Sequence, residues 1–210
     1  MRRSPPRFRP TAMDPTGILD LVSTAMIAPS GLTWDEFLAL PDDPRYKHAE
    51  LVDGEVVVDP ANWLHQHVVG EVHGLIREWI RAGTDRGGVT MDPPVKIRNN
   101  RGYLPDVAWY RTGRDRPRQG QPYLEGAPDL AVEVLSPSTR AFDLVRKRAD
   151  YARVGVPELW LIDPEGPIAL VLRAIEGPEF VLTEELDADG WLTSPLLPGL
   201  AIRVGDLIDG

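Results

Sequence analysis

The chain of 210 residues contains no cysteine, and this absence excludes several kinds of chemistry at once. Disulfide bonds, thiolate zinc sites and cysteine nucleophiles all need the missing side chain. Apolar runs are short, and none reaches the roughly 18 residues that a membrane-spanning helix requires. The basic N-terminus is not followed by the apolar stretch of a secretory signal. We therefore expect a cytoplasmic protein with no membrane partner.

Positive charge is also in short supply. Lys and Arg total 23 against 32 Asp and Glu, which gives a formal net charge of −9. Proteins that coat nucleic acids rely on clustered Lys and Arg, so this balance argues against avid coating of DNA. It does not exclude a small basic patch, or the binding of phosphate groups through a metal ion.

Several catalytic motifs are missing from the sequence. No GxGxxG or Walker A phosphate loop is present, and no two histidines have the spacing of a zinc-binding HExxH helix. Ser136 and Ser138 follow a predicted strand, but no histidine occurs after His73. The serine-hydrolase order of Ser, Asp and His therefore cannot be completed.

The chain divides into a tail and one expected domain. Residues 1–30 are rich in Pro and Arg, and we expect them to be disordered apart from a short helix near residues 18–26. Met13 would remove the first part of this tail if it is the true start. Residues 31–210 are long enough to bury a core and are expected to form a single domain.

The first ordered elements can be placed from local signals. Thr33 and Glu36 have the spacing of a capping box, which predicts a short helix after Thr33. An Asp-Gly pair predicts a hairpin between strands at residues 46–52 and 55–58. Apolar residues at helical spacing predict a long helix over residues 62–82.

The rest of the chain predicts an α/β fold with a mixed β-sheet flanked by helices and extended by hairpins. A strand–helix–strand unit at residues 129–163, with its helix ending near Val154, predicts two parallel strands with a right-handed crossover. Residues 191–208 are expected to extend an edge of the sheet. The other predicted strands lie at residues 89–91, 95–98, 104–110, 168–173 and 180–183.

Two carboxylates are notable because apolar residues surround them. Glu133 lies in Leu-Ala-Val-Glu-Val-Leu, and Asp106 lies in Leu-Pro-Asp-Val-Ala-Trp, a predicted strand with Pro105 at its entrance. Burying a carboxylate is costly unless it is paired or binds a metal. Carboxylates on neighbouring strands can share a hard cation such as Mg²⁺, so we predict that Asp106 and Glu133 belong to a metal-ion site. For Glu133, the alternative is a carboxylate at a strand end that reaches water or an arginine. For Asp106, the alternative is a turn or cap residue.

Three further residues are weaker candidates by themselves. Asp143, Lys147 and Tyr151 are spaced four residues apart, so they share one face of the predicted helix. Because this helix follows the acidic strand, that face can point toward Glu133. A surface salt bridge between Asp143 and Lys147 is the alternative. Glu50 is an acid next to a hairpin turn. His65 lies on the long helix, where a lone histidine is usually structural.

The combination of these motifs resembles the Uma-two family, a group of bacterial proteins described as restriction-endonuclease-like. The resemblance is strongest in PDLAVEVLSPSTRAFDLVRKRADYARVGVPELWLIDPE at residues 128–165 and covers roughly residues 32–175. The family in turn resembles the PD-(D/E)XK nuclease superfamily, which implies a restriction-endonuclease-like fold. The other matching segments are LTWDEFLALPDD, AELVDGEVV, the His65-Gln66 pair and LPDVAWY.

The resemblance implies a role for each candidate. Asp106 matches the Asp of the Pro-Asp motif, and Glu133 matches the acid of the (D/E)XK motif. The lysine of that motif would stand at position 135, where this sequence has Leu135. In this family the lysine is displaced to the following helix, which places it at Lys147. Glu50 matches an additional upstream acid.

The implied activity is that of a Mg²⁺-dependent endonuclease that hydrolyses phosphodiester bonds in DNA, with Mn²⁺ as a substitute ion. Glu50 would complete the metal shell or hold Lys147, and His65 would assist at the rim. A homodimer would suit the cleavage of two strands. Two alternatives stay open: a non-catalytic binding or assembly module with the nuclease fold, and a metal-dependent hydrolase of another phosphate ester. The acidic net charge and Leu135 favour the non-catalytic module.

Overall fold

The computed structural model describes residues 30–41, 43, 46, 48–58, 62–117, 119, 123–124, 126–136, 143–166, 168–175 and 177–208. The predicted disordered tail and its short helix lie outside these residues. The connection expected after Ser136 also lies outside them. None of the helices in the described ranges is both long and apolar enough to cross a membrane.

A mixed sheet of six strands forms the centre of the fold, in the order β10-β9-β8-β7-β6-β3. Strands β7 and β8 are parallel, and the other neighbouring strands are antiparallel. The mixed α/β architecture is therefore confirmed, and so is the predicted parallel pair. The strands are β3 (Gly88–Met91), β6 (Val107–Tyr110), β7 (Leu130–Val134), β8 (Glu158–Asp163), β9 (Ile168–Ala174) and β10 (Phe180–Leu186).

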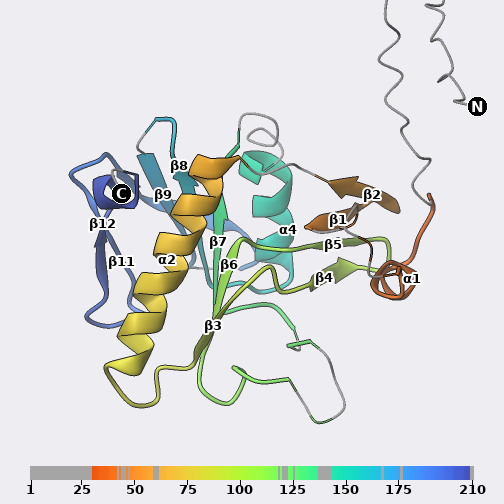
Figure 1. Ribbon diagram of the computed structural model, residues 1–210, viewed down its shortest axis with the longest axis horizontal. Coiled ribbons are helices and arrows are strands. Elements are labelled where there is room, and N and C mark those ends of the chain that lie inside the picture. Colours follow the sequence, from red (N-terminus) through yellow and green to blue (C-terminus); the bar gives the residue numbers. More distant parts are fainter. Residues whose placement is uncertain are drawn as a thin grey trace, which may run out of the picture.

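A second sheet of four strands, in the order β2-β1-β5-β4, projects to one side of the first (Figure 1). The predicted strand at residues 46–52 begins only at Ala49, because His48 has a φ of 58° and cannot continue a strand. The second sheet contains β1 (Ala49–Val52), β2 (Glu55–Val58), β4 (Val95–Arg98) and β5 (Arg101–Tyr103).

The prediction of one strand over residues 104–110 is wrong in its first half. The chain leaves the second sheet at Tyr103 and enters the central sheet only at Val107. Pro105 lies in the crossing and has no N–H to donate to a ladder. Asp106 is therefore the residue immediately before β6, and it is not embedded in a strand.

Helices cover both faces of the central sheet (Figure 1). The long helix α2 (Trp63–Arg81) packs on one face, and α4 (Arg148–Arg153) packs on the other. A π-helical turn, η2 (Asp143–Lys147), leads directly into α4. The short helix α1 (Trp34–Leu38) begins at the predicted capping box, in which Thr33 and Glu36 bond each other.

The alternation of side chains along β7 decides where its acid points. Val132 and Val134 belong to the core beneath α2, whereas Ala131 and Leu135 belong to the core beneath α4. Successive side chains of a strand point to opposite faces, so Glu133 faces α4 and η2. The central acid therefore meets the helix that follows it in the chain.

Residues 191–208 were expected to extend an edge of the central sheet, but they do not. Strands β11 (Trp191–Thr193) and β12 (Ala201–Arg203) form a separate sheet of two strands, followed by the 3-10 helix η3 (Gly205–Leu207). Their apolar side chains complete the core beneath α2. The Trp79 indole of α2 anchors this segment by donating to the Pro198 carbonyl at 3.1 Å. Burial of these scattered apolar residues explains the difference.

Replacing Gly102 should test how α1 docks on the second sheet. A Cβ at this position would lie 1.8 Å from Cζ3 of Trp34, which is only 5% exposed. We expect Gly102→Ala to lower the free energy of unfolding by about 1–3 kcal/mol in urea titrations. Gly70→Ala is the control, because an added Cβ would meet nothing within 4 Å beyond its chain neighbours and the backbone of its own helix, and it should stabilise α2 by about 0.5–1 kcal/mol. Equal stability of Gly102→Ala and the wild type would contradict the close contact.

Candidate active site

A buried ammonium group lies between two carboxylates at the centre of the candidate site. Lys147 Nζ is 2.9 Å from Oε1 of Glu50 and 3.1 Å from Oε2 of Glu133. The side chain of Lys147 is 8% exposed, and those of Glu50 and Glu133 are 15% and 3% exposed. The three groups come from β1, β7 and η2, so the contact joins both sheets to the helix.

Hydrogen bonds hold each carboxylate in place. The Tyr151 hydroxyl donates to Oε1 of Glu133 at 2.6 Å, and the Leu104 amide donates to Oε1 of Glu50 at 3.0 Å. Burial raises the pKa of Tyr151, and the charge of Glu133 raises it further. The phenol therefore stays protonated and acts as a donor to Glu133.

Asp106 joins this group through the backbone of β7. The antiparallel register pairs Val107 with Val132, and continuing it by one residue sets Asp106 opposite Glu133. The Val134 amide donates to Oδ2 of Asp106 at 2.7 Å. Nε2 of His65, on the first turn of α2, lies 3.3 Å from the same oxygen. The Asp106 carboxylate is thus fixed between a strand and a helix.

The structure brings together the five residues named from the sequence, which are Glu50, His65, Asp106, Glu133 and Lys147. It also accounts for the departure from the nuclease motif. Leu135 is 4% exposed and packs in the apolar core beneath α4. Lys147 reaches Glu133 from the helix. The side chain of Asp143 lies outside the described part, so its predicted pairing stays a prediction.

The charges of the site favour a cation. Glu50, Asp106 and Glu133 supply three carboxylates against the one ammonium group of Lys147. Among the described residues, however, no group of three or more His, Cys, Asp or Glu side chains is arranged to hold a metal ion. A closed protein shell of the zinc type does not fit this arrangement. Mg²⁺ does fit, because it is usually bound by one or two carboxylates and keeps several waters.

The ligand atoms that such an ion would use can be named. Within the described part of the chain, both contacts of Asp106 use Oδ2, which leaves Oδ1 for a cation. Oε2 of Glu133 accepts a hydrogen bond from Lys147, and Oε1 accepts one from Tyr151. Oε1 of Glu50 accepts from both Lys147 and the Leu104 amide. That arrangement favours Glu50 as the holder of Lys147, and its role as a metal ligand stays a prediction.

Asp92 is an acid near the site that the sequence analysis missed. Nδ1 of His48 lies 3.1 Å from Oδ2 of Asp92, and both residues have left-handed backbones, with φ of 58° and 49°. Burial raises the pKa of Asp92, and the nearby charge of Asp106 raises it as well. No periodic pattern marks an isolated Asp before a Pro-Pro pair, so only the fold reveals it.

Asp92 also lines a pocket beside the site. Ala49 and Leu104, which flank or support Glu50, form part of its wall, together with aromatic residues such as Phe37 and Tyr123. The pocket has a volume of about 220 Å³. This is less than the range of roughly 300–1,000 Å³ that is typical of sites for small molecules.

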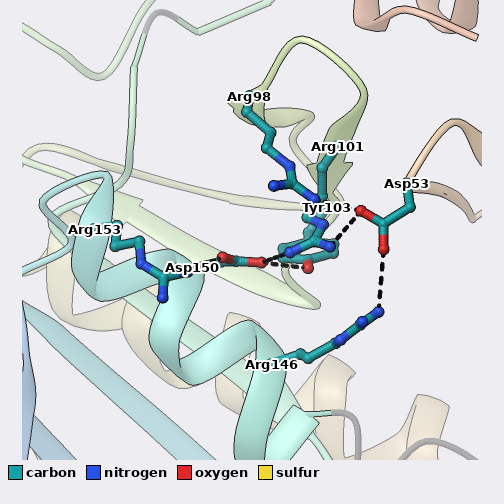
Figure 2. Close-up of polar contacts among 7 residues, drawn as sticks. All are labelled: Asp53, Arg98, Arg101, Tyr103, Arg146, Asp150 and Arg153. Atoms are coloured by element: carbon teal, nitrogen blue, oxygen red, sulfur yellow. Dashed lines mark hydrogen bonds and ion pairs between the residues drawn. The ribbon is translucent and has the colours of Figure 1, made fainter.

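A second polar network, also missed, adjoins the site through Tyr103. The ring of Tyr103 lies 5.6 Å from Lys147 Nζ, and its hydroxyl donates to Oδ2 of Asp150 at 2.7 Å. Nη1 of Arg101 donates to the same oxygen at 2.8 Å (Figure 2). Burial raises the pKa of Tyr103 well above its usual range. Arg101 and Asp150 carried no signal in the sequence, because arginine and aspartate in hairpins and helices are usually solvated.

Removing the ammonium group of Lys147 should show how strongly the two buried carboxylates destabilise the fold when their cation is absent. Lys147→Met would leave Glu50 and Glu133 as neighbouring charges without their cation, and we expect a loss of about 3 kcal/mol in the free energy of unfolding. The double variant with Glu50→Gln should lose less, because one stranded charge is gone. Chemical denaturation at neutral and acidic pH measures both effects, and the loss should shrink in acid. A Lys147→Met protein as stable as the wild type would show that the three groups do not interact.

The raised pKa of Asp92 predicts a dependence of stability on pH. Below the unfolded value of 3.8 both states hold the proton, so wild type and Asp92→Asn should be equally stable. As pH rises through the higher folded pKa, the unfolded state releases the proton more readily, and the wild type loses stability relative to Asp92→Asn. Urea titrations across this range measure the difference. A variant that is less stable than the wild type at neutral pH would contradict the direction.

The comparisons with known proteins match the region of the chain that contains this site. Residues 34–205 match the Uma2 family, which is described as "Putative restriction endonuclease". A solved structure from Anabaena variabilis ATCC 29413, titled as a putative nuclease belonging to DUF820, superposes with a TM-score of 0.69 at 21% identity. The match covers 84% of this chain and 97% of that one, so the two share a fold. No functionally curated protein matches the sequence.

The predicted resemblance is therefore confirmed, and the restriction-endonuclease-like fold is confirmed with it. The matched segment includes all five predicted site residues, from Glu50 to Lys147. The chain belongs to the Uma2 family.

Proposed function

We propose that this protein is a Mg²⁺-dependent endonuclease that hydrolyses phosphodiester bonds in DNA. The observation that carries the proposal is the contact of Lys147 with both Glu50 and Glu133, one register position from Asp106. A buried cluster of this kind adds little to stability compared with apolar side chains of the same size. Its presence in a family described as restriction endonucleases supports a catalytic use.

Asp106 and Glu133 would hold the Mg²⁺ ion, with Mn²⁺ as a substitute. When bound there, the ion would polarise the scissile phosphate and lower the pKa of a water molecule. The Lys147 ammonium group would orient that water and offset the negative charge that develops on the phosphate.

The surrounding residues would position these groups. Glu50 holds Lys147, Tyr151 fixes the rotamer of Glu133, and His65 orients Asp106. Such supporting contacts typically change metal affinity or activity by about 10–100-fold when removed.

Two observations favour the non-catalytic module. The net charge is acidic, and Leu135 fills the position of the motif lysine and packs in the core. In this alternative, the protein would keep the nuclease fold and use it for binding or assembly. A homodimer, which would suit the cleavage of two strands, also stays a prediction.

Cleavage assays separate these functions. The purified protein is incubated with supercoiled plasmid, single-stranded DNA and branched DNA, with Mg²⁺, Mn²⁺ or EDTA. We expect metal-dependent nicks, with losses of more than about 100-fold in Asp106→Asn and Glu133→Gln, because both remove a metal ligand. The control is Glu185→Gln, which removes an exposed acid of β10 and should cleave as the wild type does.

Each remaining outcome has a clear meaning. Cleavage that survives Glu133→Gln would point to a contaminating nuclease and would contradict the proposed site. Binding without cleavage under all conditions would support the non-catalytic module. Isothermal titration of Mn²⁺ into wild type and Asp106→Asn gives a readout that does not depend on turnover, and equal binding would exclude Asp106 as a ligand.

A further inference from the structure

Four arginines surround two carboxylates beside the site, and together they form what we call the arginine cluster: Arg98, Arg101, Arg146 and Arg153 around Asp53 and Asp150 (Figure 2). Asp53 accepts bonds from Arg98 and Arg101, and its Oδ2 lies 3.3 Å from Nη1 of Arg146. Asp150 accepts from Arg101 at 2.8 Å and from Arg153 at 2.9 Å. The cluster brings together β4, β5, η2, α4 and the β1–β2 turn.

Within this set of six residues, the arginines outnumber the carboxylates by four to two. Three guanidinium groups converge on the single carboxylate of Asp53, although one is enough for an ion pair. The contrast is Arg203, which lies between the carboxylates of Asp189 and Asp206. Cations that converge in this way repel one another, so a further anion at the cluster would be favoured.

The cluster has an exposed part and a buried base. The side chains of Arg98 and Arg146 are 53% and 51% exposed, and that of Asp53 is 41% exposed. The side chains of Arg101 and Asp150, at 8% and 4%, form the buried base. Guanidinium groups match phosphate oxygens in both charge and geometry. Asp and Glu outnumber Lys and Arg in this chain by 32 to 23, which makes the gathering of four arginines at one place informative.

The cluster also shares a wall with the candidate active site. Arg146 precedes Lys147 in η2, and the two side chains reach different acids, Asp53 and Glu133. Tyr103 bonds Asp150 through its hydroxyl while its ring faces Lys147 Nζ. A polymer that places one phosphate at the site can therefore place a neighbouring phosphate at the cluster.

We propose that Arg98 and Arg146 bind backbone phosphates of the nucleic-acid substrate next to the cleaved bond, and that Asp53 occupies these arginines until the phosphates displace it. This inference rests on the proposed function, because it assumes a nucleic-acid substrate. It assigns the substrate-binding surface to the face that the β1–β2 turn, β4 and η2 share. Backbone contacts of this kind position a substrate without reading its sequence.

Binding measured at several salt concentrations tests the proposal without turnover. A short labelled duplex and a matching single strand are titrated with the full chain in EDTA, and the slope of log K against log salt is compared between variants. Each phosphate contact contributes about 0.9 to that slope for duplex DNA. We expect Arg98→Ala and Arg146→Ala each to lose about 0.9 of slope and roughly tenfold in affinity. Arg98→Lys should keep the slope because it keeps the charge.

Asp53→Asn distinguishes a phosphate site from structural ion pairs. Asparagine tolerates the left-handed backbone at this position, where φ is 53°, so the turn should survive. Removing the competing charge should raise affinity about tenfold and steepen the slope. If the arginines only tie the hairpin to the helix, Asp53→Asn should lower the melting temperature and leave affinity unchanged. Arg203→Ala, at the opposite end of the fold, is the matched control and should bind as the wild type does.

The outcomes separate this inference from the proposed function. Metal-dependent cleavage with unchanged slopes in Arg98→Ala and Arg146→Ala would overturn the arginine cluster alone. The expected slope changes without any cleavage would overturn the nuclease alone. Absence of nucleic-acid binding would overturn both. Binding of inorganic phosphate that Arg98→Ala abolishes, with no binding of either DNA, would assign the cluster to a small phosphate ligand and would also overturn the proposal.

Discussion

The contact of the Lys147 ammonium group with the Glu50 and Glu133 carboxylates is the interaction on which the candidate site depends. Taking charges out of water costs several kcal/mol for each ion unless the partners are well placed. Here the partners come from β1, β7 and η2, so satisfying the charges requires both sheets and the helix to meet at one point. The hydroxyl of Tyr151 and the amide of Leu104 complete the coordination of the two acids. The same contact therefore organises the fold and creates the chemistry that we propose.

Unbalanced charge appears twice around this point, with opposite signs. The site holds three carboxylates against one ammonium group, and the adjoining arginine cluster holds four guanidinium groups against two carboxylates. Tyr103 lies between them, because its ring faces Lys147 and its hydroxyl bonds Asp150. A divalent cation would compensate the first imbalance, and a phosphate chain would compensate the second. The two features together describe a surface for a metal-assisted reaction on a polyanion, within a protein whose net charge is acidic.

Local sequence patterns allowed much of this to be predicted. The apolar run at residues 129–135 placed Glu133 in a buried strand, and the four-residue spacing of Lys147 and Tyr151 placed them on one helix face. Features that lack such a pattern were not predicted. The left-handed backbones of His48 and Asp92 shorten one strand and bring an unexpected acid to the site. The passage from β5 to β6 divides a run that reads as one strand, because Pro105 lies between two different sheets. The C-terminal strands were misplaced because their pairing is local, while their burial depends on α2.

The central claim is that Asp106 and Glu133 hold a divalent cation beside Lys147. A crystal structure of the protein soaked with Mn²⁺, with an anomalous difference map collected near the manganese edge, tests it most directly. The account predicts one peak in contact with both Asp106 and Glu133, and loss of that peak in Asp106→Asn. Lys147 should remain against Glu50 in both crystals. A map with no peak at these carboxylates, in crystals where Mn²⁺ binds elsewhere, would contradict the account.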